Sequence, residues 1–199
     1  MFTLLFLLVS YSFMAQETVK QREIGLVFNN LNGFGLTYKT GTNKSLWRFN
    51  TLMVSGNNMN NKSDDTTLKQ SSFGFGVKIG REYRKNIVKN LELRFGADLS
   101  FLYTQAKSDY DYLAYNNQVR INEMTSYSPG VNLVFGFNYL INEKIIFGAE
   151  LLPSFNYVTG TAAETLFYNN DAQEVKQDFS GFNYGLSNTS VLLSVAYRF

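Results

Sequence analysis

Nonpolar and polar residues alternate along most of this chain, and the alternation restricts the fold more than any other sequence feature. In the stretch LELRFGADLSFLY, nonpolar side chains occupy every second position from Leu91 to Tyr103, and the intervening positions hold Glu92, Arg94 and Asp98. Successive side chains of a β-strand point to opposite faces, so this pattern predicts a long strand with two unlike faces. Residues 17–199 show no helical period of consequence.

The same alternation recurs and predicts eight strands in an antiparallel up-and-down order. We expect them at residues 22–29, 33–40, 46–55, 73–84, 91–105, 129–141, 145–159 and 189–199. Pro153 interrupts the seventh strand and is expected at a bulge, because proline cannot donate a ladder hydrogen bond. Short turns such as TGTNKS, KNIVKN and NEK lie at one end, whereas long polar loops are expected at residues 56–72, 107–128 and 161–188. Short turns opposite long loops are typical of outer-membrane barrels.

Alternation alone does not say which face points inward. A secreted soluble lipocalin-like barrel, with a small apolar ligand inside, has the same strand number and the opposite orientation. Two features favour a transmembrane barrel with its apolar face toward lipid. The polar face is rich in glycine, which suits a crowded lumen: Gly25, Gly35, Gly74, Gly76, Gly96, Gly136 and Gly148. Aromatic residues lie near the strand ends, where a membrane interface favours Trp and Tyr: Trp47, Tyr103, Tyr139, Tyr157, Tyr197 and Phe199.

The N-terminus has the features of a signal peptide. The apolar run from Phe2 to Ala15 is shorter than the roughly 20 residues of a membrane-spanning helix, and the small Ala15 suits cleavage. No Lys or Arg precedes the run, and Phe13 is a poor residue three positions before the cut, so a buried N-terminal strand or helix is the alternative. We predict a signal peptide at 1–16 and one barrel domain at 17–199.

The composition excludes several kinds of function. The chain contains neither histidine nor cysteine, so disulfides, thiolate zinc sites and Ser-His-Asp catalysis are excluded, and neither a metal nor a cofactor is expected. Carboxylate pairs at Asp64 and Asp65, and at Asp109 and Asp111, lie in polar stretches and are interpreted as solvated surface. The net charge is +2 with scattered basic residues, which does not favour nucleic-acid binding. We therefore expect a protein that is not an enzyme.

If the apolar face meets lipid, the polar face places charges of both signs in the lumen. The predicted charge network comprises Arg48, Lys78, Glu82, Glu92, Arg94, Asp98, Glu150 and Arg198, with Glu23 and Lys39 on the same face. An eight-stranded barrel is just wide enough for its side chains to fill, and buried charges must pair. A salt-bridge plug is the first interpretation, and a narrow or gated ion path, giving a weak porin-like role, is the second.

The expected loops between strands are polar yet contain aromatic residues common at interfaces, including Tyr110, Tyr112, Tyr115 and Tyr127. They are candidates for binding an extracellular partner. The alternative is that they only shield the barrel from solvent.

The alternation, the turn lengths and the final strand together resemble the small eight-stranded outer-membrane barrels, OmpA-like and OmpX-like, of the Gram-negative cell envelope. The high content of Asn and Tyr resembles that of porin-like families of Bacteroidota. The C-terminal residues Val195, Tyr197 and Phe199 are similar to the signal that the barrel-assembly machinery recognises. The resemblance implies a monomer in outer-membrane lipid, with both termini in the periplasm.

Overall fold

The computed structural model describes residues 19–30, 33–63, 66–112, 118–168, 171–186 and 190–199. The predicted signal peptide at 1–16 lies outside these residues, as do Asp64, Asp65 and Tyr115. Within the described part of the chain, no helix is long and apolar enough to cross a membrane.

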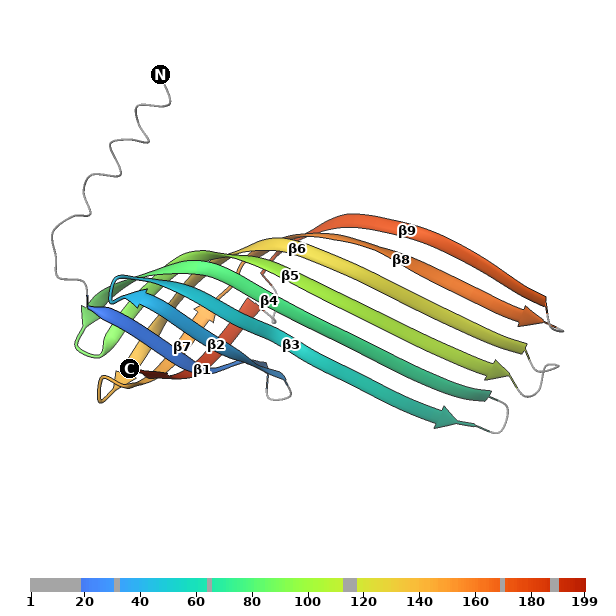
Figure 1. Ribbon diagram of the computed structural model, residues 1–199, viewed down its shortest axis with the longest axis horizontal. Coiled ribbons are helices and arrows are strands. Elements are labelled where there is room, and N and C mark those ends of the chain that lie inside the picture. Colours follow the sequence, from blue (N-terminus) through green and yellow to red (C-terminus); the bar gives the residue numbers. More distant parts are fainter. Residues whose placement is uncertain (1–18, 31–32, 64–65, 113–117, 169–170, 187–189) are drawn as a thin grey trace, which may run out of the picture.

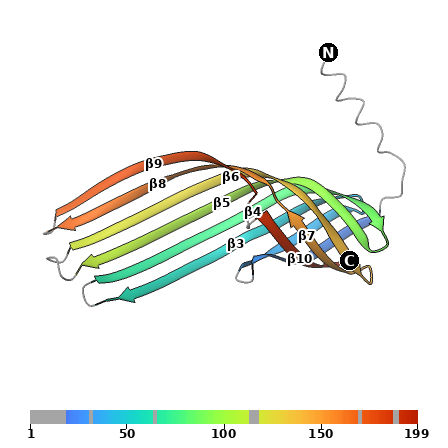
Figure 2. The ribbon, with the colours of Figure 1, turned by 180° about the vertical axis from the view of Figure 1, so that it is seen from behind.

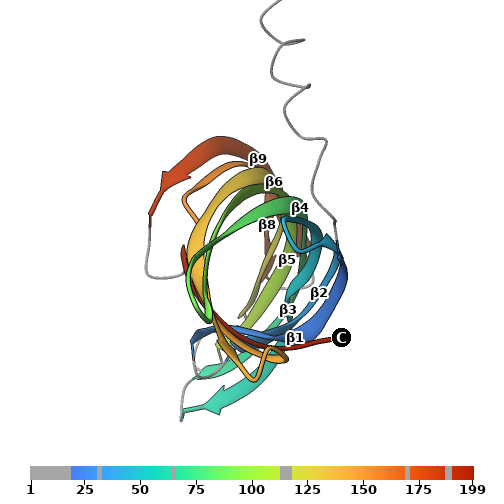
Figure 3. The same cartoon turned by 90° about the vertical axis from the view of Figure 1, so that its left-hand side faces the viewer.

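The described residues form ten strands in one antiparallel sheet (Figures 1 and 2). The strands are β1 (Lys20–Asn30), β2 (Gly33–Thr42), β3 (Ser45–Lys62), β4 (Thr66–Val88), β5 (Leu91–Tyr112), β6 (Gln118–Ile141), β7 (Ile145–Leu151), β8 (Ser154–Tyr168), β9 (Asp171–Gly185) and β10 (Val191–Arg198). Hydrogen bonds join β1 through β7 in chain order, then β7 to β10 and β10 to β1, so eight strands form a ring (Figure 3). The predicted eight-stranded barrel is confirmed.

Two of the barrel strands are interrupted and resume in the same direction. β6 pairs with β7 over its C-terminal part and with β8 over its N-terminal part, so β7 and β8 follow the same neighbour. The interruption lies at Leu152 and Pro153, as the proline predicted. β9 and β10 are related in the same way, and the amide of Leu152 donates to the carbonyl of Ser190 at 2.7 Å where both strands are interrupted.

The prediction of long polar loops at residues 56–72, 107–128 and 161–188 is wrong. Most of these residues continue β3, β4, β5, β6, β8 and β9 beyond the barrel as a six-stranded sheet, which we call the extended sheet (Figure 1). Both faces of this sheet are polar and partly exposed, so hydropathy does not alternate there. The alternation of polar and apolar residues therefore predicted only the barrel part of each strand, where one face is apolar.

The apolar face points outward from the barrel and the polar face points inward. Exposed fractions are 48% for Ile79, 68% for Leu99 and 51% for Phe135, whereas Arg48, Glu82 and Arg94 are at most 1% exposed. This orientation is the reverse of a lipocalin-like barrel, so that alternative is excluded. The turns after β2, β4 and β6 and the C-terminus lie at the end opposite the extended sheet, which we call the turn end (Figure 1).

Candidate functional site

The polar face of the barrel carries a group of ionisable side chains that we call the lumen cluster. Its members are Glu23, Lys39, Arg48, Lys78, Glu82, Arg84, Glu92, Arg94, Asp98, Glu150 and Arg198. All are buried except Arg198, whose side chain is 17% exposed. Each occupies an inward position of the strand alternation, so the cluster follows directly from the period of two.

Arg48 on β3 lies at the centre of the cluster and contacts carboxylates from three other strands. Its Nη2 lies 2.7 Å from Oε1 of Glu150 on β7, and its Nη1 lies 3.1 Å from Oε2 of Glu82 on β4. Its Nε lies 3.2 Å from Oδ1 of Asp98 on β5. The contact with Glu150 joins strands that are not neighbours in the ring, so these side chains cross the lumen.

Arg94 and Lys39 add further contacts to the same carboxylates. Arg94 Nη2 lies 3.1 Å from Glu150 Oε2, and Lys39 Nζ lies 2.9 Å from Glu82 Oε2. Glu82 therefore meets cations from three other strands, since Lys39 is on β2, Arg48 is on β3, and Arg94, at 3.9 Å, is on β5. A buried carboxylate needs such partners, because an uncompensated buried charge costs several kcal/mol.

A second layer toward the turn end is built around Arg84, which the sequence analysis did not include. Arg84 Nη1 and Nη2 donate to the carboxylate of Glu23 at 2.6 and 2.7 Å, and the guanidinium also pairs with Glu82. Arg198 bridges Glu23 and Glu92, each at 2.9 Å. Arg84 is the last residue of the strand expected at 73–84 and continues the inward positions of Lys78 and Glu82, so the same period identifies it when it is applied to the end of that strand.

Lys78 and Asp98 lie at the margin of the cluster. Lys78 is 8% exposed and forms no ion pair with another described residue. Both carboxylate oxygens of Asp98 lack a well-aligned hydrogen bond within the described part of the chain, although Arg48 lies close. Both residues are buried on the inward face to which the alternation assigned them, but the pairing of Lys78 differs from that of the other cations.

Aromatic side chains surround the outside of the barrel near both ends. Near the extended sheet, ring centroids are 5.6 Å apart for Phe75 and Tyr103 and 5.3 Å apart for Tyr103 and Tyr127. Near the turn end, Arg81 lies over the ring of Trp47 at 5.5 Å. An outward apolar wall between two aromatic belts is the surface of a membrane-spanning barrel.

Comparison with known proteins agrees with this geometry. Residues 55–172, more than half of the chain, match the model of the OmpA-OmpF-like porin family. The chain belongs to this family. The outward apolar wall and the membership of this family together show that this porin-family chain is an outer-membrane β-barrel.

Two solved structures are similar over most of their length. A major outer membrane protein from Thermus thermophilus has 9% sequence identity and a TM-score of 0.47, covering 91% of this chain and 100% of that chain. CarO of Acinetobacter baumannii has 13% identity and a TM-score of 0.33, covering 92% of this chain and 97% of that chain. No curated protein sequence matches the chain.

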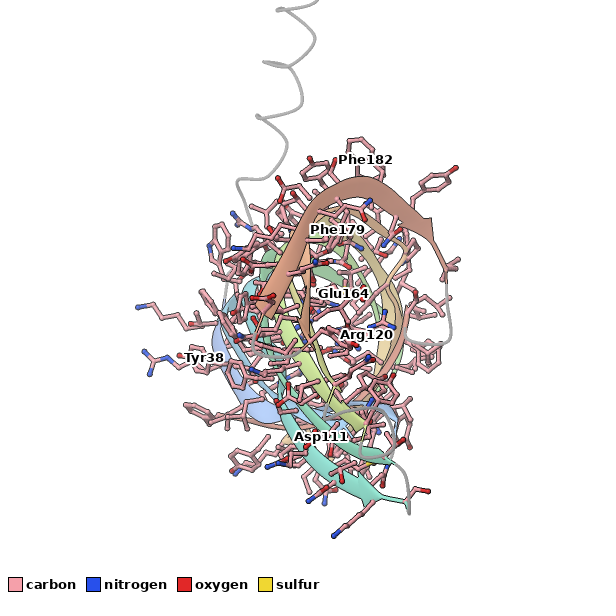
Figure 4. All side chains as sticks on the ribbon, turned by 90° about the vertical axis from the view of Figure 1, so that its right-hand side faces the viewer. Tyr38, Asp111, Arg120, Glu164, Phe179 and Phe182 are labelled. Atoms are coloured by element: carbon pink, nitrogen blue, oxygen red, sulfur yellow. The ribbon has the colours of Figure 1, made fainter. Side chains whose placement is uncertain are left out.

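The extended sheet of this porin-family barrel has two different polar faces. On the outer face, Lys107 Nζ lies 2.9 Å from Glu123 Oε1, and this hydrogen bond raises the pKa of Lys107. On the inner face, which continues the lumen wall, Arg120 Nε lies 2.9 Å from Glu164 Oε1 (Figure 4). Asp109 and Asp111, which were expected in a loop, both belong to β5.

The tyrosines expected in one interaction loop are divided between the two regions. Tyr110 and Tyr112 lie in the extended sheet with nearly parallel rings, 6.5 Å apart. Tyr127 belongs instead to the aromatic belt of the barrel, where it contacts Tyr103. The sequence could not separate these roles because the belt and the sheet follow each other within single strands.

The C-terminal residues close the barrel. Val195, Tyr197 and Phe199 point outward with exposed fractions of 40%, 46% and 60%. The amide of Phe199 donates to the carbonyl of Arg22 at 3.0 Å, and the amide of Arg22 donates back at 3.2 Å. The first and last described barrel strands are therefore joined as far as the terminal residue.

Proposed function

We propose that this protein is a non-enzymatic outer-membrane barrel with a closed lumen, which presents the extended sheet outside the cell as an interaction surface. The observation that carries the proposal is that cluster ion pairs cross the lumen between strands that are not neighbours. Arg48 joins β3 to β7, Arg84 joins β4 to β1, and Arg198 joins β10 to β5. These side chains occupy the cross-section of a barrel that is already narrow.

The extended sheet supports the second half of the proposal. It continues β4, β5 and β6 well beyond the aromatic belt, and it ends laterally at β9 and at the last part of β3, whose outer edges have no partner among the described strands. Natural proteins usually protect long strand edges, so exposed edges and exposed polar faces mark surface available for binding. In this proposal the sheet faces outward, and the turn end and both termini face the periplasm.

We further propose the route by which the chain reaches this location. Residues 1–16 direct export, and the outward side chains of Val195, Tyr197 and Phe199 form the segment that the barrel-assembly machinery recognises. The proposal includes a monomer, which is supported by a ring of strands that closes within one chain.

Conductance in planar lipid bilayers tests the closed lumen. We expect no steady channel current from the folded wild-type protein. A triple variant, Arg48→Ser, Arg94→Ser and Glu150→Ser, removes the centre of the cluster and is expected to allow measurable ion flow if it inserts. Lys107→Ser, on the outer face of the extended sheet, is the matched control and stays silent. Reproducible wild-type currents that scale with the amount of inserted protein would refute the closed lumen and support a porin-like role.

A further inference from the structure

The inner face of the extended sheet holds a hollow directly above the barrel lumen. It has a volume of about 390 Å³ and is formed by β5, β6, β8 and β9. Its principal lining side chains are Ser108, Arg120, Asn122, Met124, Glu164 and Gln177. This volume falls within the range of roughly 300–1,000 Å³ found for small-ligand pockets. Figure 4 views the molecule from the side of the extended sheet, with Arg120 and Glu164 on its inner face.

The polar groups of the hollow have unused hydrogen-bonding capacity. Arg120 and Glu164 pair through one nitrogen, yet their side chains remain 41% and 39% exposed. Ser108, Asn122 and Gln177 form no side-chain hydrogen bond with another described residue. Hydrogen-bond donors and acceptors thus lie together on one concave face. The two charged side chains of the lining that point inward, Arg120 and Glu164, have opposite signs, so their net charge is zero.

Apolar and aromatic groups flank these polar side chains. Met124 and Val175 are 47% and 68% exposed. Tyr110 lies opposite Arg120 in the strand pairing, and its ring is nearly parallel to that of Tyr112, with an interplanar angle of 14°. Phe179, near the base of the hollow, lies over Gly160, where an added Cβ would come within 2.7 Å of the ring (Figure 4).

This combination selects a ligand class. An anionic ligand would meet the Glu164 carboxylate, and a hydrocarbon chain would leave Arg120, Asn122 and Gln177 without water or partners. A neutral saccharide offers hydroxyl groups that both donate and accept, and its C–H faces pack against aromatic rings and apolar side chains. Charged side chains form the stronger hydrogen bonds to such hydroxyls.

We infer that the hollow is a binding site for a neutral saccharide, in which Arg120 and Glu164 hydrogen-bond the hydroxyl groups and Tyr110 provides a packing surface. The inference rests on the proposed function in one respect, namely that the extended sheet is exposed outside the membrane. The sugar can come from a free glycan or from the headgroup of a membrane glycolipid, because both present the same hydroxyl chemistry.

The test uses the full folded protein in a detergent without a sugar headgroup, such as lauryldimethylamine oxide. The protein is applied to an array of neutral and anionic oligosaccharides, and the best neutral probe is then titrated. We expect Glu164→Gln to weaken binding roughly tenfold or more, since a hydrogen bond to a charged group contributes about that much. Ser108→Leu replaces a hydroxyl in the hollow with a larger apolar side chain and is expected to weaken binding by a similar factor. Asp178→Asn is the matched control, because Asp178 does not line the hollow and accepts a hydrogen bond from Thr161 on the opposite face of the same sheet.

Three results would overturn the inference: no neutral oligosaccharide binds above background, only anionic ones bind, or the Glu164→Gln and Asp178→Asn variants bind the sugar equally well. Unchanged gel mobility of each variant shows that it is folded. Parallel titrations with the neutral oligosaccharide itself and with nanodiscs containing a neutral glycolipid that carries the same sugar separate a free glycan from a lipid headgroup, and binding to either supports the site. If no sugar binds and the bilayers stay silent, the saccharide site fails while the closed barrel stands.

Discussion

At the scale of single residues, the lumen is stable because the arginines at its centre meet carboxylates from other strands. Arg48 contacts Glu82, Asp98 and Glu150, and no water-filled channel is needed to keep it charged. Each charged side chain stabilises its partners, since removing any one of them leaves the opposite charges buried without a counter-charge. Truncation of one charged side chain is therefore expected to lower the stability of the barrel more than replacement of the whole cluster by well-packed apolar residues.

We predict that Arg48→Ala lowers the free energy of unfolding by about 3–5 kcal/mol, the usual cost of breaking a buried ion pair. Arg94→Ala also destabilises, but by less, because only Glu150 lies within 3.1 Å of its guanidinium. The measurement is urea unfolding in detergent micelles. Lys107→Ala is the control: its pair with Glu123 is exposed, so about 0–1 kcal/mol is expected. Equal midpoints for Arg94→Ala and wild type would contradict a buried network.

Glycines on the inner face allow neighbouring strands to approach closely. A Cβ at Gly25 would lie 2.2 Å from the carbonyl oxygen of Val195 and 2.6 Å from the Cα of Ala196, both on β10. We predict that Gly25→Ala destabilises the barrel by about 1–3 kcal/mol, because the obstructing atoms belong to backbone. Gly181→Ala on β9 is the matched control, since nothing lies within 4 Å of its added Cβ. Comparable stability of the two variants in urea would argue against the close approach.

At the scale of elements, β10 has two roles. It seals the ring through its pairing with β1, from Phe28 opposite Leu193 to Glu23 opposite Arg198. It also ends beside the last outward aromatic pair, formed by its Tyr197 and by Phe199 directly after it, with ring centroids 6.5 Å apart. Closure leaves no unpaired edge within the barrel wall, as a lipid environment requires.

We predict that deletion of Phe199 prevents normal assembly into the outer membrane, because it removes both the terminal hydrogen bonds to Arg22 and the outward ring. Phe199→Ala separates the two effects: it keeps the backbone pair and removes only the ring. Quantitative immunoblots of outer-membrane fractions measure the result. Wild-type levels of the truncated chain would refute the prediction, and a defect shared by Phe199→Ala would assign the effect to the side chain.

At the scale of the whole molecule, a barrel inside the membrane and an open sheet above it share continuous strands. β4, β5 and β6 pass through both regions, so the sheet is held by the same hydrogen-bond ladders that build the barrel. Four strands, β1, β2, β7 and β10, are confined to the barrel. The ring therefore closes where these strands are present, and the sheet is open beyond them.

This architecture predicts heat modifiability. Because the closed ring has no free edge and a buried ionic centre, we expect it to stay folded in dodecyl sulfate without heating and to migrate differently from the boiled sample. Electrophoresis of paired boiled and unboiled samples provides the measurement. A protein that shows no shift and partitions into the aqueous phase of a detergent extraction would not be a membrane barrel.

The sequence predicted most of the barrel because lipid outside and charge inside impose a strict period of two. That period located Arg48, Glu82 and Arg94 on one face without any structure. It did not locate the extended sheet, because strands wetted on both faces have no reason to alternate. It also missed Arg84, which lies at the end of an expected strand.

The sequence by itself determined the strand period, the outward apolar wall and the set of inward charges, since each depends only on neighbours along one strand. The tertiary structure alone decided which charges meet, such as Arg48 with Glu150, residues 102 positions apart. It also decided that Arg120 and Glu164 share one hollow. Such contacts depend on strand register and barrel closure, which are set by all the strands together and cannot be derived from any one of them.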